Sequence, residues 1–287
     1  MNLAKLAELL DKEFSVAKTK EELVRWAVTE ENKPYLNPAF LNKQSGLFLK
    51  SSQVIEKVYT TVFITDCIVK KIADQKSKSL IFTHHHFDYY EDYRGLVPIS
   101  AFNLKQLKGA NASIFVAHAS LDHHDRYGTS ISLAKLLNIE IDELFYDYFG
   151  APTALVGHIV KTPFSGFADN VKQKLGRPAL TLEKNNETVE KIAVVAGGGD
   201  MPDILQQAKD YGCDTYLTGM IEHRWENAMI QESNKKFHEL NKQLKLNLIG
   251  GTHFGTERPA MVSVVKFFKD IGVDAEYCED EILLHAL

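Results

Sequence analysis

Short apolar runs rich in β-branched and aromatic residues alternate with stretches of helical periodicity, and this alternation constrains the fold more than any other feature. It is typical of an α/β protein whose sheets are buried under helices. The expected strands span residues 61–65, 80–84, 113–117, 155–160, 192–196, 215–218 and 246–249. The expected helices span residues 67–73, 99–107, 131–137, 204–211 and 261–271. Before them, an amphipathic pattern predicts an N-terminal helix, and the capping-box pattern of Thr19 to Glu22 predicts a second one.

The length of 287 residues suits either one large α/β domain or two smaller ones, each with a real core. Polar turns and an aromatic run interrupt the alternation between residues 125 and 152, and the polar stretch 183–190 predicts an exposed turn. We therefore expect two α/β domains. The first combines residues 1–125 with 248–287, and the second spans residues 126–247.

The composition argues against several classes of protein. A formal charge of −5 disfavours a nucleic-acid-binding protein, because such proteins carry a basic footprint. Cys67, Cys213 and Cys278 lie far apart and form no C-x-x-C pair, so neither a disulfide framework nor a thiolate zinc site is indicated. No apolar run is long enough for a signal peptide or a membrane span. We therefore expect a cytoplasmic protein without a membrane partner.

Three consecutive histidines, His84, His85 and His86, follow the apolar run 80–83. In open α/β sheets, functional groups gather beyond the carboxyl ends of strands. Neighbouring residues of a regular strand point to opposite sides. If both His84 and His85 bind metal, either the backbone has left the strand or each binds a different ion. A surface loop that happens to be rich in histidine is the alternative.

A second strand, 113–117, is followed by His118 and Asp122. Asp122 offers an anionic oxygen that suits a hard metal ion, and we expect His118 beside it as a hydrogen-bond donor or substrate contact. His123 and His124 follow directly, but no strand positions them, so we expect solvated turn residues there.

A third strand, 246–249, leads through two glycines to His253 and Glu257. A spacing of four places both side chains on one face of a helix. Pro259 lacks an N–H group and fits only the first helical turn, which predicts a helix that begins near Thr256. His253 would then lie in the preceding turn. Three strand ends thus present imidazoles and carboxylates, a donor set that suits zinc, iron or manganese.

These segments resemble the Nif-three-like family of dinuclear-metal proteins, some of which are called type 2 GTP cyclohydrolases. The family pattern runs His-His, then His-x-x-x-Asp, then Gly-His-x-x-x-Glu, and it is matched in order by His84-His85, His118 to Asp122 and His253 to Glu257. Residues 192–200 with Thr218-Gly219 resemble two further family segments. The resemblance implies a pair of related α/β domains with mixed sheets flanked by helices, two divalent metal ions per chain and a homohexamer. The implied metal ligands are His84, His85, Asp122, His253 and Glu257.

Two positions depart from the family pattern. His86 follows the doublet where the family has proline or glycine, so the doublet is either His84-His85 or His85-His86. Met220 stands where the family usually has glutamate, although Glu222 and His223 lie close in the sequence.

From a site with two metal ions we predict hydrolysis of a small molecule. Such ions lower the pKa of bound water and polarise the group that the water attacks. The family name suggests a purine nucleotide such as GTP as the substrate. His118 and His223 are the candidate catalytic proton shuttles, since a histidine titrates near neutrality. The run Gly197 to Asp200 lacks the residues of a P-loop, so we expect a tight turn rather than an anion site. The alternative function is a non-catalytic metal-binding protein or an interaction scaffold.

Overall fold

The computed structural model describes residues 1–22, 24–42 and 45–286, and the chain divides into two compact units. The first unit comprises Met1–Tyr90, Leu96–Tyr127 and Met261–Ile282. The second comprises Glu91–Gly95, Gly128–Ala260 and Leu283–Leu287. Both His253 and Glu257 thus belong to the second unit, whereas the division expected from the sequence assigned residues 248–287 to the first domain.

The first unit contains a mixed sheet with the strand order β1-β6-β3-β2-β13. Strands β6, β3, β2 and β13 run parallel, and β1 is antiparallel to β6. Its strands are β1 (Gly46–Leu49), β2 (Lys57–Thr61), β3 (Ser79–Thr83), β6 (Ala112–Val116) and β13 (Asp274–Tyr277). Strands β4 (Phe87–Tyr90) and β5 (Gly95–Pro98) form a small separate sheet. The mixed, largely parallel sheet confirms the predicted α/β class.

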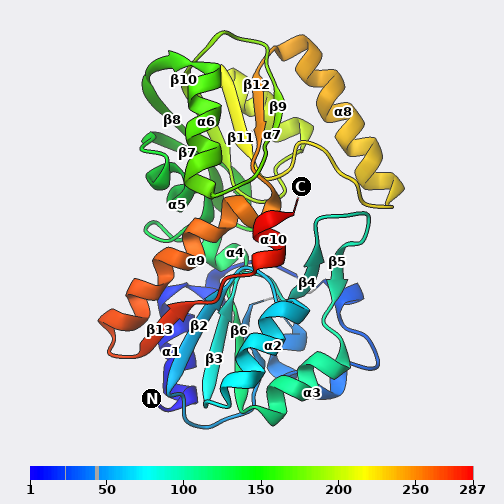
Figure 1. Ribbon diagram of the computed structural model, residues 1–287, viewed down its shortest axis with the longest axis vertical. Helices are drawn as coiled ribbons and strands as arrows, with labels where there is room; N and C mark the ends of the chain where they lie inside the picture. Colours follow the sequence, from blue (N-terminus) through cyan, green and yellow to red (C-terminus); the bar gives the residue numbers. More distant parts are fainter. Residues whose placement is uncertain (23, 43–44, 287) are drawn as a thin grey trace. The chain divides into compact units, whose positions relative to one another are not determined.

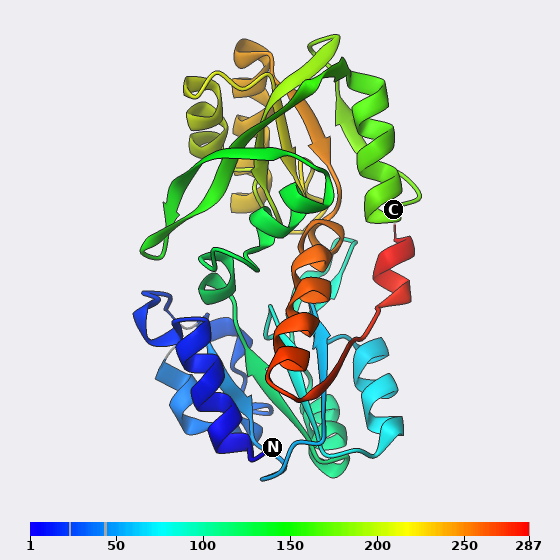
Figure 2. The same cartoon turned by 90° about the vertical axis from the view of Figure 1, so that its left-hand side faces the viewer.

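Helices cover both faces of this sheet (Figures 1 and 2). Side chains of α2 (Asp66–Gln75) and α3 (Ala101–Gly109) pack with Tyr59, Ile81 and Ile114 in one apolar cluster. On the other face, Phe82 contacts Phe14, which follows α1 (Leu3–Glu13), and Phe268 of α9 (His253–Asp270). Alternate strand residues therefore point to opposite layers, as the pleat of a strand requires. Two short helices, α4 (Ala119–Asp122) and α10 (Glu281–His285), follow β6 and β13 along the chain.

The second unit contains a mixed sheet with the strand order β7-β8-β10-β11-β12-β9. Strands β10, β11 and β12 run parallel. The strands are β7 (Glu140–Tyr148), β8 (Ala151–Pro163), β9 (Thr181–Glu183), β10 (Thr188–Val195), β11 (Thr215–Thr218) and β12 (Asn247–Gly250). One face packs on α5 (Thr129–Leu136) and α6 (Phe164–Leu175), and the other on α7 (Pro202–Asp210) and α8 (Ala228–Leu244).

Three sequence expectations about these segments were wrong, and a fourth was confirmed in part. Strand β2 ends at Thr61, and residues 62–65 form an irregular link in which Thr65 caps α2. The pattern from Thr19 to Glu22 opens no helix, because Glu21 is buried and its carboxylate accepts the amide hydrogen of Ala119. The aromatic run inside residues 125–152 belongs to the hairpin of β7 and β8 rather than to a break. The expectation of an exposed turn in 183–190 was right in part, because residues 184–187 connect β9 to β10 and are mostly exposed, whereas residues 188–190 belong to β10.

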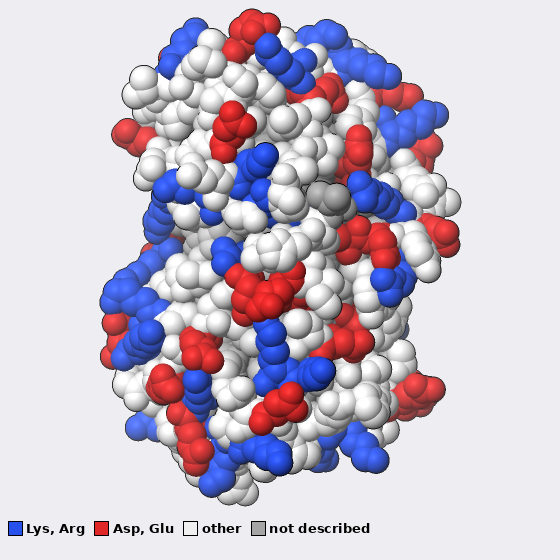
Figure 3. Space-filling view, viewed as in Figure 1, with Lys and Arg blue, Asp and Glu red and all other residues white. Residues whose placement is uncertain are grey.

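Charged side chains of both signs are mixed over the face of the molecule shown in Figure 3. This agrees with the modest net charge of −5. No helix among residues 1–22, 24–42 and 45–286 is long and apolar enough to cross a membrane. Within the same residues, the three cysteines are free thiols.

Candidate metal centre

Two parallel strands of the first unit position one group of donors. Strand β3 ends at Thr83, which pairs with Val116 at the end of β6. The chain beyond Thr83 therefore emerges beside the chain beyond Val116, at the carboxyl edge of the sheet, where functional groups gather in α/β proteins. His84 and His85 follow β3 directly, and His118 follows β6 after one residue.

The His84 ring is fixed by the backbone of the neighbouring strand end. Its Nδ1 lies 2.9 Å from the carbonyl oxygen of Ala117. Because a carbonyl oxygen can only accept, Nδ1 carries the proton and Nε2 keeps its lone pair. Nε2 lies 3.7 Å from Oδ1 of Asp122, and both side chains are largely buried. This arrangement, with a backbone acceptor on the other ring nitrogen, is the usual one for metal-binding histidines.

His85 and His86 lie outside regular strand, so the alternation of a strand no longer separates the donors of His84 and His85. The His85 amide donates to the carbonyl oxygen of Val62, and its ring stacks on Phe63 with centroids 4.5 Å apart. His86 packs instead against Phe40 and Phe87. Burial lowers the pKa of His86 to about 3, so this ring is neutral at physiological pH. The geometry therefore favours His84-His85 as the doublet.

His118 is held by a buried carboxylate from a distant part of the chain. Its Nδ1 contacts Oε1 of Glu21, and Oε2 of Glu21 accepts hydrogen bonds from the Ala119 amide at 3.3 Å and the Ser45 hydroxyl at 3.4 Å. Burial raises the pKa of Glu21, but the charge and hydrogen bond of His118 outweigh burial and lower that pKa overall. Burial lowers the pKa of His118, and the Glu21 charge reverses this, so the pKa of His118 is raised.

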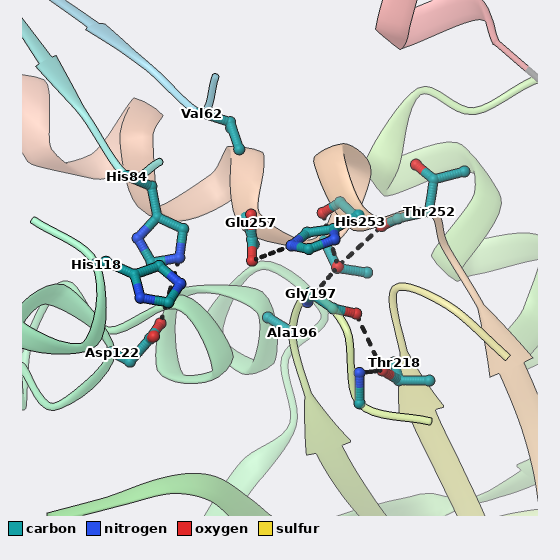
Figure 4. A network of polar contacts seen from close by, with 12 residues as sticks. Val62, His84, His118, Asp122, Ala196, Gly197, Thr218, Thr252, His253 and Glu257 are labelled. Atoms are coloured by element: carbon teal, nitrogen blue, oxygen red, sulfur yellow. Dashed lines mark hydrogen bonds and ion pairs between the residues drawn. The ribbon is translucent and has the colours of Figure 1, made fainter. Parts of the chain in front are cut away.

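The first unit thereby brings three imidazoles together. One ring nitrogen from each of His84, His85 and His118 lies within 4.8 Å of the other two. Figure 4 shows His84, His118 and Asp122 turned toward one another. Imidazole nitrogens with a carboxylate oxygen form a donor set that suits zinc, iron or manganese. This group of residues could therefore hold a divalent ion.

The second unit contributes a pair of donors from the first turns of α9. His253 Nε2 lies 3.0 Å from Oε1 of Glu257, and both side chains are buried. The expectation that a helix begins near Thr256 was wrong, because α9 begins at His253 and contains Pro259 in its interior. Thr252 caps the N-terminus of this helix. Its Oγ1 accepts a hydrogen bond from the Gly255 amide, and its carbonyl oxygen accepts one from the Thr256 amide. The spacing of four residues then places both donors on one helical face, as predicted.

A glycine of the second unit makes room for this pair. Gly197 has φ +79°, and a Cβ atom there would overlap Oε1 of Glu257 and lie 3.2 Å from Nε2 of His253. Only glycine allows so close a backbone approach. Thr252, at φ +65°, is a β-branched residue in the left-handed region, where strain is often stored beside functional groups. The backbone conformations of Gly197 and Thr252 thus allow the side chains of His253 and Glu257 to lie close together.

The glycine run Gly197 to Gly199 forms a tight turn, and the amides of Gly197 and Gly199 already have acceptors. The Gly197 amide donates to Thr256 Oγ1 at 2.9 Å, and the Gly199 amide donates to Thr218 Oγ1 at 3.1 Å. The carbonyl oxygen of Gly197 accepts from the Gly219 amide at 3.0 Å. Because these amides are committed within the unit, the run serves as a turn rather than as an anion cradle.

His223 is also oriented by a carboxylate, but in the second unit. Its Nε2 lies 2.7 Å from Oδ1 of Asp200, while Oδ2 accepts from the side-chain amide of Asn234 at 3.0 Å. Both members of the His223–Asp200 pair are buried, and the His223 ring packs edge-on against Trp225. In the sequence, His223 lies between two residues that line a cavity of the second unit. The lining residues are Glu91, Asp92, Thr181, Gly219, Met220, Ile221, Glu222, Arg224, Trp225 and Thr252.

Three features of the site were not predicted from the sequence: the roles of Glu21 and Asp200 and the close approach of Gly197. Glu21 carried no usable signal, because a glutamate in a capping-box pattern predicts a helix start. Asp200 was visible only as the residue that follows a glycine run. The contact of Gly197 with Glu257 depends on how α9 packs against the end of β10.

This fold and these buried imidazole–carboxylate groups define an α/β protein that could bind divalent metal ions. Residues 41–279 match the model of the Duf34/NIF3 (NGG1p interacting factor 3) family, and the chain therefore belongs to this family. The match confirms the family resemblance predicted from the histidine motifs.

Named relatives agree with this assignment. The chain is 24% identical over 237 residues to the GTP cyclohydrolase 1 type 2 homolog of Haemophilus influenzae, covering 81% of this chain and 88% of the relative. It is 26% identical over 221 residues to the protein of the same name from Pyrococcus horikoshii, covering 75% and 81%. The solved structure of protein ybgI, described as of unknown function, superimposes with a TM-score of 0.72 at 19% identity over 98% of both chains. At this identity the structural likeness shows the fold alone.

Proposed function

We propose that this chain is a divalent-metal-dependent hydrolase of a small molecule. In this proposal the ligands of two metal ions are His84, His85, Asp122, His253 and Glu257. The observation that carries it is the convergence of imidazole donors from the buried His84 and His85 and the partly buried His118 beyond the ends of β3 and β6. Imidazole nitrogens gathered this closely form a donor set that suits a divalent metal ion.

The residues present fit such ions by their chemistry. The proton on Nδ1 of His84 leaves Nε2 as a donor beside Asp122. At Gly197, the space that a Cβ atom would fill is occupied by Oε1 of Glu257 and lies beside Nε2 of His253. When bound, the ions would acidify water and polarise the electrophile that it attacks.

His223 is the proton-transfer group that the surroundings favour most. Its Nε2 faces the Asp200 carboxylate, which can only accept, so Nε2 carries the proton and Nδ1 keeps the lone pair. A carboxylate that holds an imidazole in one tautomer is a recurrent arrangement in acid–base catalysis. His223 lies between the cavity-lining residues Glu222 and Arg224. This supports a role in moving a proton to or from a molecule bound in that cavity.

A purine nucleotide is the first substrate to test. The support for it is the name of the relatives, GTP cyclohydrolase 1 type 2 homolog, and it comes to this chain only by that similarity. A homohexamer, as the family resemblance implies, is a further part of the proposal. Light scattering of the purified full-length chain measures the assembly directly, and a monomeric mass would contradict it.

Metal analysis of protein purified without chelators or nickel columns tests the proposal. We expect about two ions per chain, a sharp loss in His85→Ala and Glu257→Ala, and release of a hydrolysis product from GTP that stops when metal is removed. Wild-type protein that takes up no zinc or manganese would refute both metal binding and hydrolysis. Metal-replete protein that leaves purine nucleotides unchanged, while ligand variants still assemble, would favour the scaffold function instead.

A further inference from the structure

We infer that His118 is a metal ligand of this protein and that Glu21 is the positioning residue that turns it toward the metal. The inference rests on the metal-binding part of the proposed function and adds a donor to it. It reassigns His118, for which the sequence predicted proton transfer, to coordination.

The first support is the direction in which the His118 ring is held. Glu21 is buried, and its Oε1 contacts Nδ1 of His118. Because a carboxylate oxygen accepts hydrogen bonds, Nδ1 of His118 acts as the donor in this contact, and Nε2 is the ring nitrogen suited to bind metal. The ring centroid of His118 lies 4.9 Å from that of His84 and 4.8 Å from that of His85.

The second support is the number of donors that one ion needs. Catalytic zinc sites use three protein ligands and structural sites use four, and imidazole nitrogens and carboxylate oxygens are among the donors that zinc accepts. His84, His85 and His118 offer three nitrogens within 4.8 Å of one another, and Asp122 offers an oxygen 3.7 Å from Nε2 of His84. When His118 is included, the first unit alone therefore offers four donors, the number found in a four-coordinate zinc site.

The third support is the way in which Glu21 itself is fixed. The Ala119 amide and the Ser45 hydroxyl both donate to its Oε2, so the carboxylate is held in place beside the His118 contact. Glu21 lies before residue 41, where the match to the Duf34/NIF3 family begins. The positioning of His118 thus depends on a segment of this chain outside the family match. Outer carboxylates of this kind typically change metal affinity by about 10- to 100-fold when removed.

Zinc affinity of the metal-free full-length chain, measured by competition with a chelator, tests the inference. We expect the tighter zinc-binding event to weaken by about 10- to 100-fold in Glu21→Ala and by at least as much in His118→Ala. The double variant should bind no worse than His118→Ala, because Glu21 acts only through the ring. Glu22→Ala is the matched control, since Glu22 is the exposed neighbouring carboxylate, and it should bind as the wild type does.

X-ray absorption of zinc-loaded wild type provides a readout that does not depend on the variants folding. It should count one more imidazole per chain than the three histidines His84, His85 and His253 supply. Zinc affinity unchanged in a folded His118→Ala variant, or only three imidazoles per chain in wild type, would overturn the inference. Zinc binding that follows these expectations in a protein without hydrolytic activity would refute the proposed hydrolase and leave the role of His118 standing.

Discussion

The carboxylate of Glu21 contacts the ring of His118, which lies 97 residues further along the chain, and both side chains are largely buried. The contact ties an irregular N-terminal segment to the turn that follows β6. It also sets which nitrogen of His118 carries the proton. A glutamate outside the family match therefore holds a ring that lies beside the candidate ligands His84 and His85.

Removal of one member of this pair should destabilise the metal-free protein more than removal of both. A buried charge left without its partner costs about 3 kcal/mol or more, whereas a pair replaced together costs far less. We therefore expect Glu21→Ala to lower the free energy of unfolding by about 3 kcal/mol, and the double variant with His118→Ala to lose less than the sum of the single losses. Urea unfolding in the presence of a chelator measures all four proteins. If the loss in the double variant equals the sum of the two single losses, the Glu21–His118 contact contributes no interaction free energy to stability.

Gly197→Ala should disrupt the His253–Glu257 pair. The added methyl group would overlap Oε1 of Glu257, so the carboxylate must move, and we expect zinc affinity to fall by about 10- to 100-fold. Gly212→Ala is the matched control, because Gly212 has φ +80° and no atom within 4 Å of the added carbon. Both variants should lose about 1–2 kcal/mol of stability from backbone strain. Equal zinc affinity in Gly197→Ala and Gly212→Ala would show that the close approach of Gly197 to Glu257 does not matter for metal binding.

Asp88 should make the stability of the protein fall as the pH rises. Burial raises the pKa of Asp88 to about 6, against the partly opposing hydrogen bonds from the Tyr89 amide and the Tyr90 hydroxyl. The folded state therefore binds the proton more tightly than the unfolded state, whose pKa is near 3.8. This contribution is full below pH 3.8 and is lost as the pH rises through about 6.

Between pH 5 and pH 8, the Asp88 contribution to stability should fall by about 1 kcal/mol. Urea unfolding of wild type and Asp88→Asn at both pH values isolates it, because asparagine does not titrate. We expect the variant to gain stability relative to wild type at pH 8 and much less at pH 5. A difference that does not change with pH would contradict the raised pKa.

Asp200→Asn should invert the tautomer of His223. In wild type, Oδ1 of Asp200 accepts from Nε2, so the proton of the neutral ring lies on Nε2. An asparagine can keep its oxygen toward Asn234 and donate its amide hydrogen to Nε2, which moves the ring proton to Nδ1. Nitrogen chemical shifts of ¹⁵N-histidine protein report the tautomer. The exposed Asp210→Asn serves as control, and a wild-type ring protonated on Nδ1 would exclude the arrangement used in the proposed function.

Periodicity in the sequence was enough to predict the α/β class and most central strands, because buried parallel strands require unbroken apolar runs. The same holds for the helices at α2, α3, α5 and α7, whose apolar faces recur every three to four residues. The histidine and carboxylate motifs were visible because the candidate ligands follow strand ends closely. The family match to residues 41–279 then confirmed the family that those motifs predicted.

Tertiary contacts determined two local conformations that the sequence patterns predicted wrongly: the start of α9 and the segment from Thr19 to Glu22. Pro259 argued for a late start of α9, yet the cap from Thr252 and the packing of Thr256 against Gly197 stabilise a helix that begins at His253. A capping box at Thr19 is a local preference, and burial of Glu21 against His118 overrides it.

The three strand ends with their candidate ligands were thus readable from the sequence, and the partners that orient the rings were not. His84 depends on a carbonyl oxygen of Ala117, His118 on Glu21 and His223 on Asp200. Each of these contacts joins residues between 23 and 97 positions apart, and only the folded chain brings them within hydrogen-bond distance. The sequence by itself determined which residues are candidate metal ligands, and the fold determined which ring nitrogen of His84, His118 and His223 faces a hydrogen-bond acceptor.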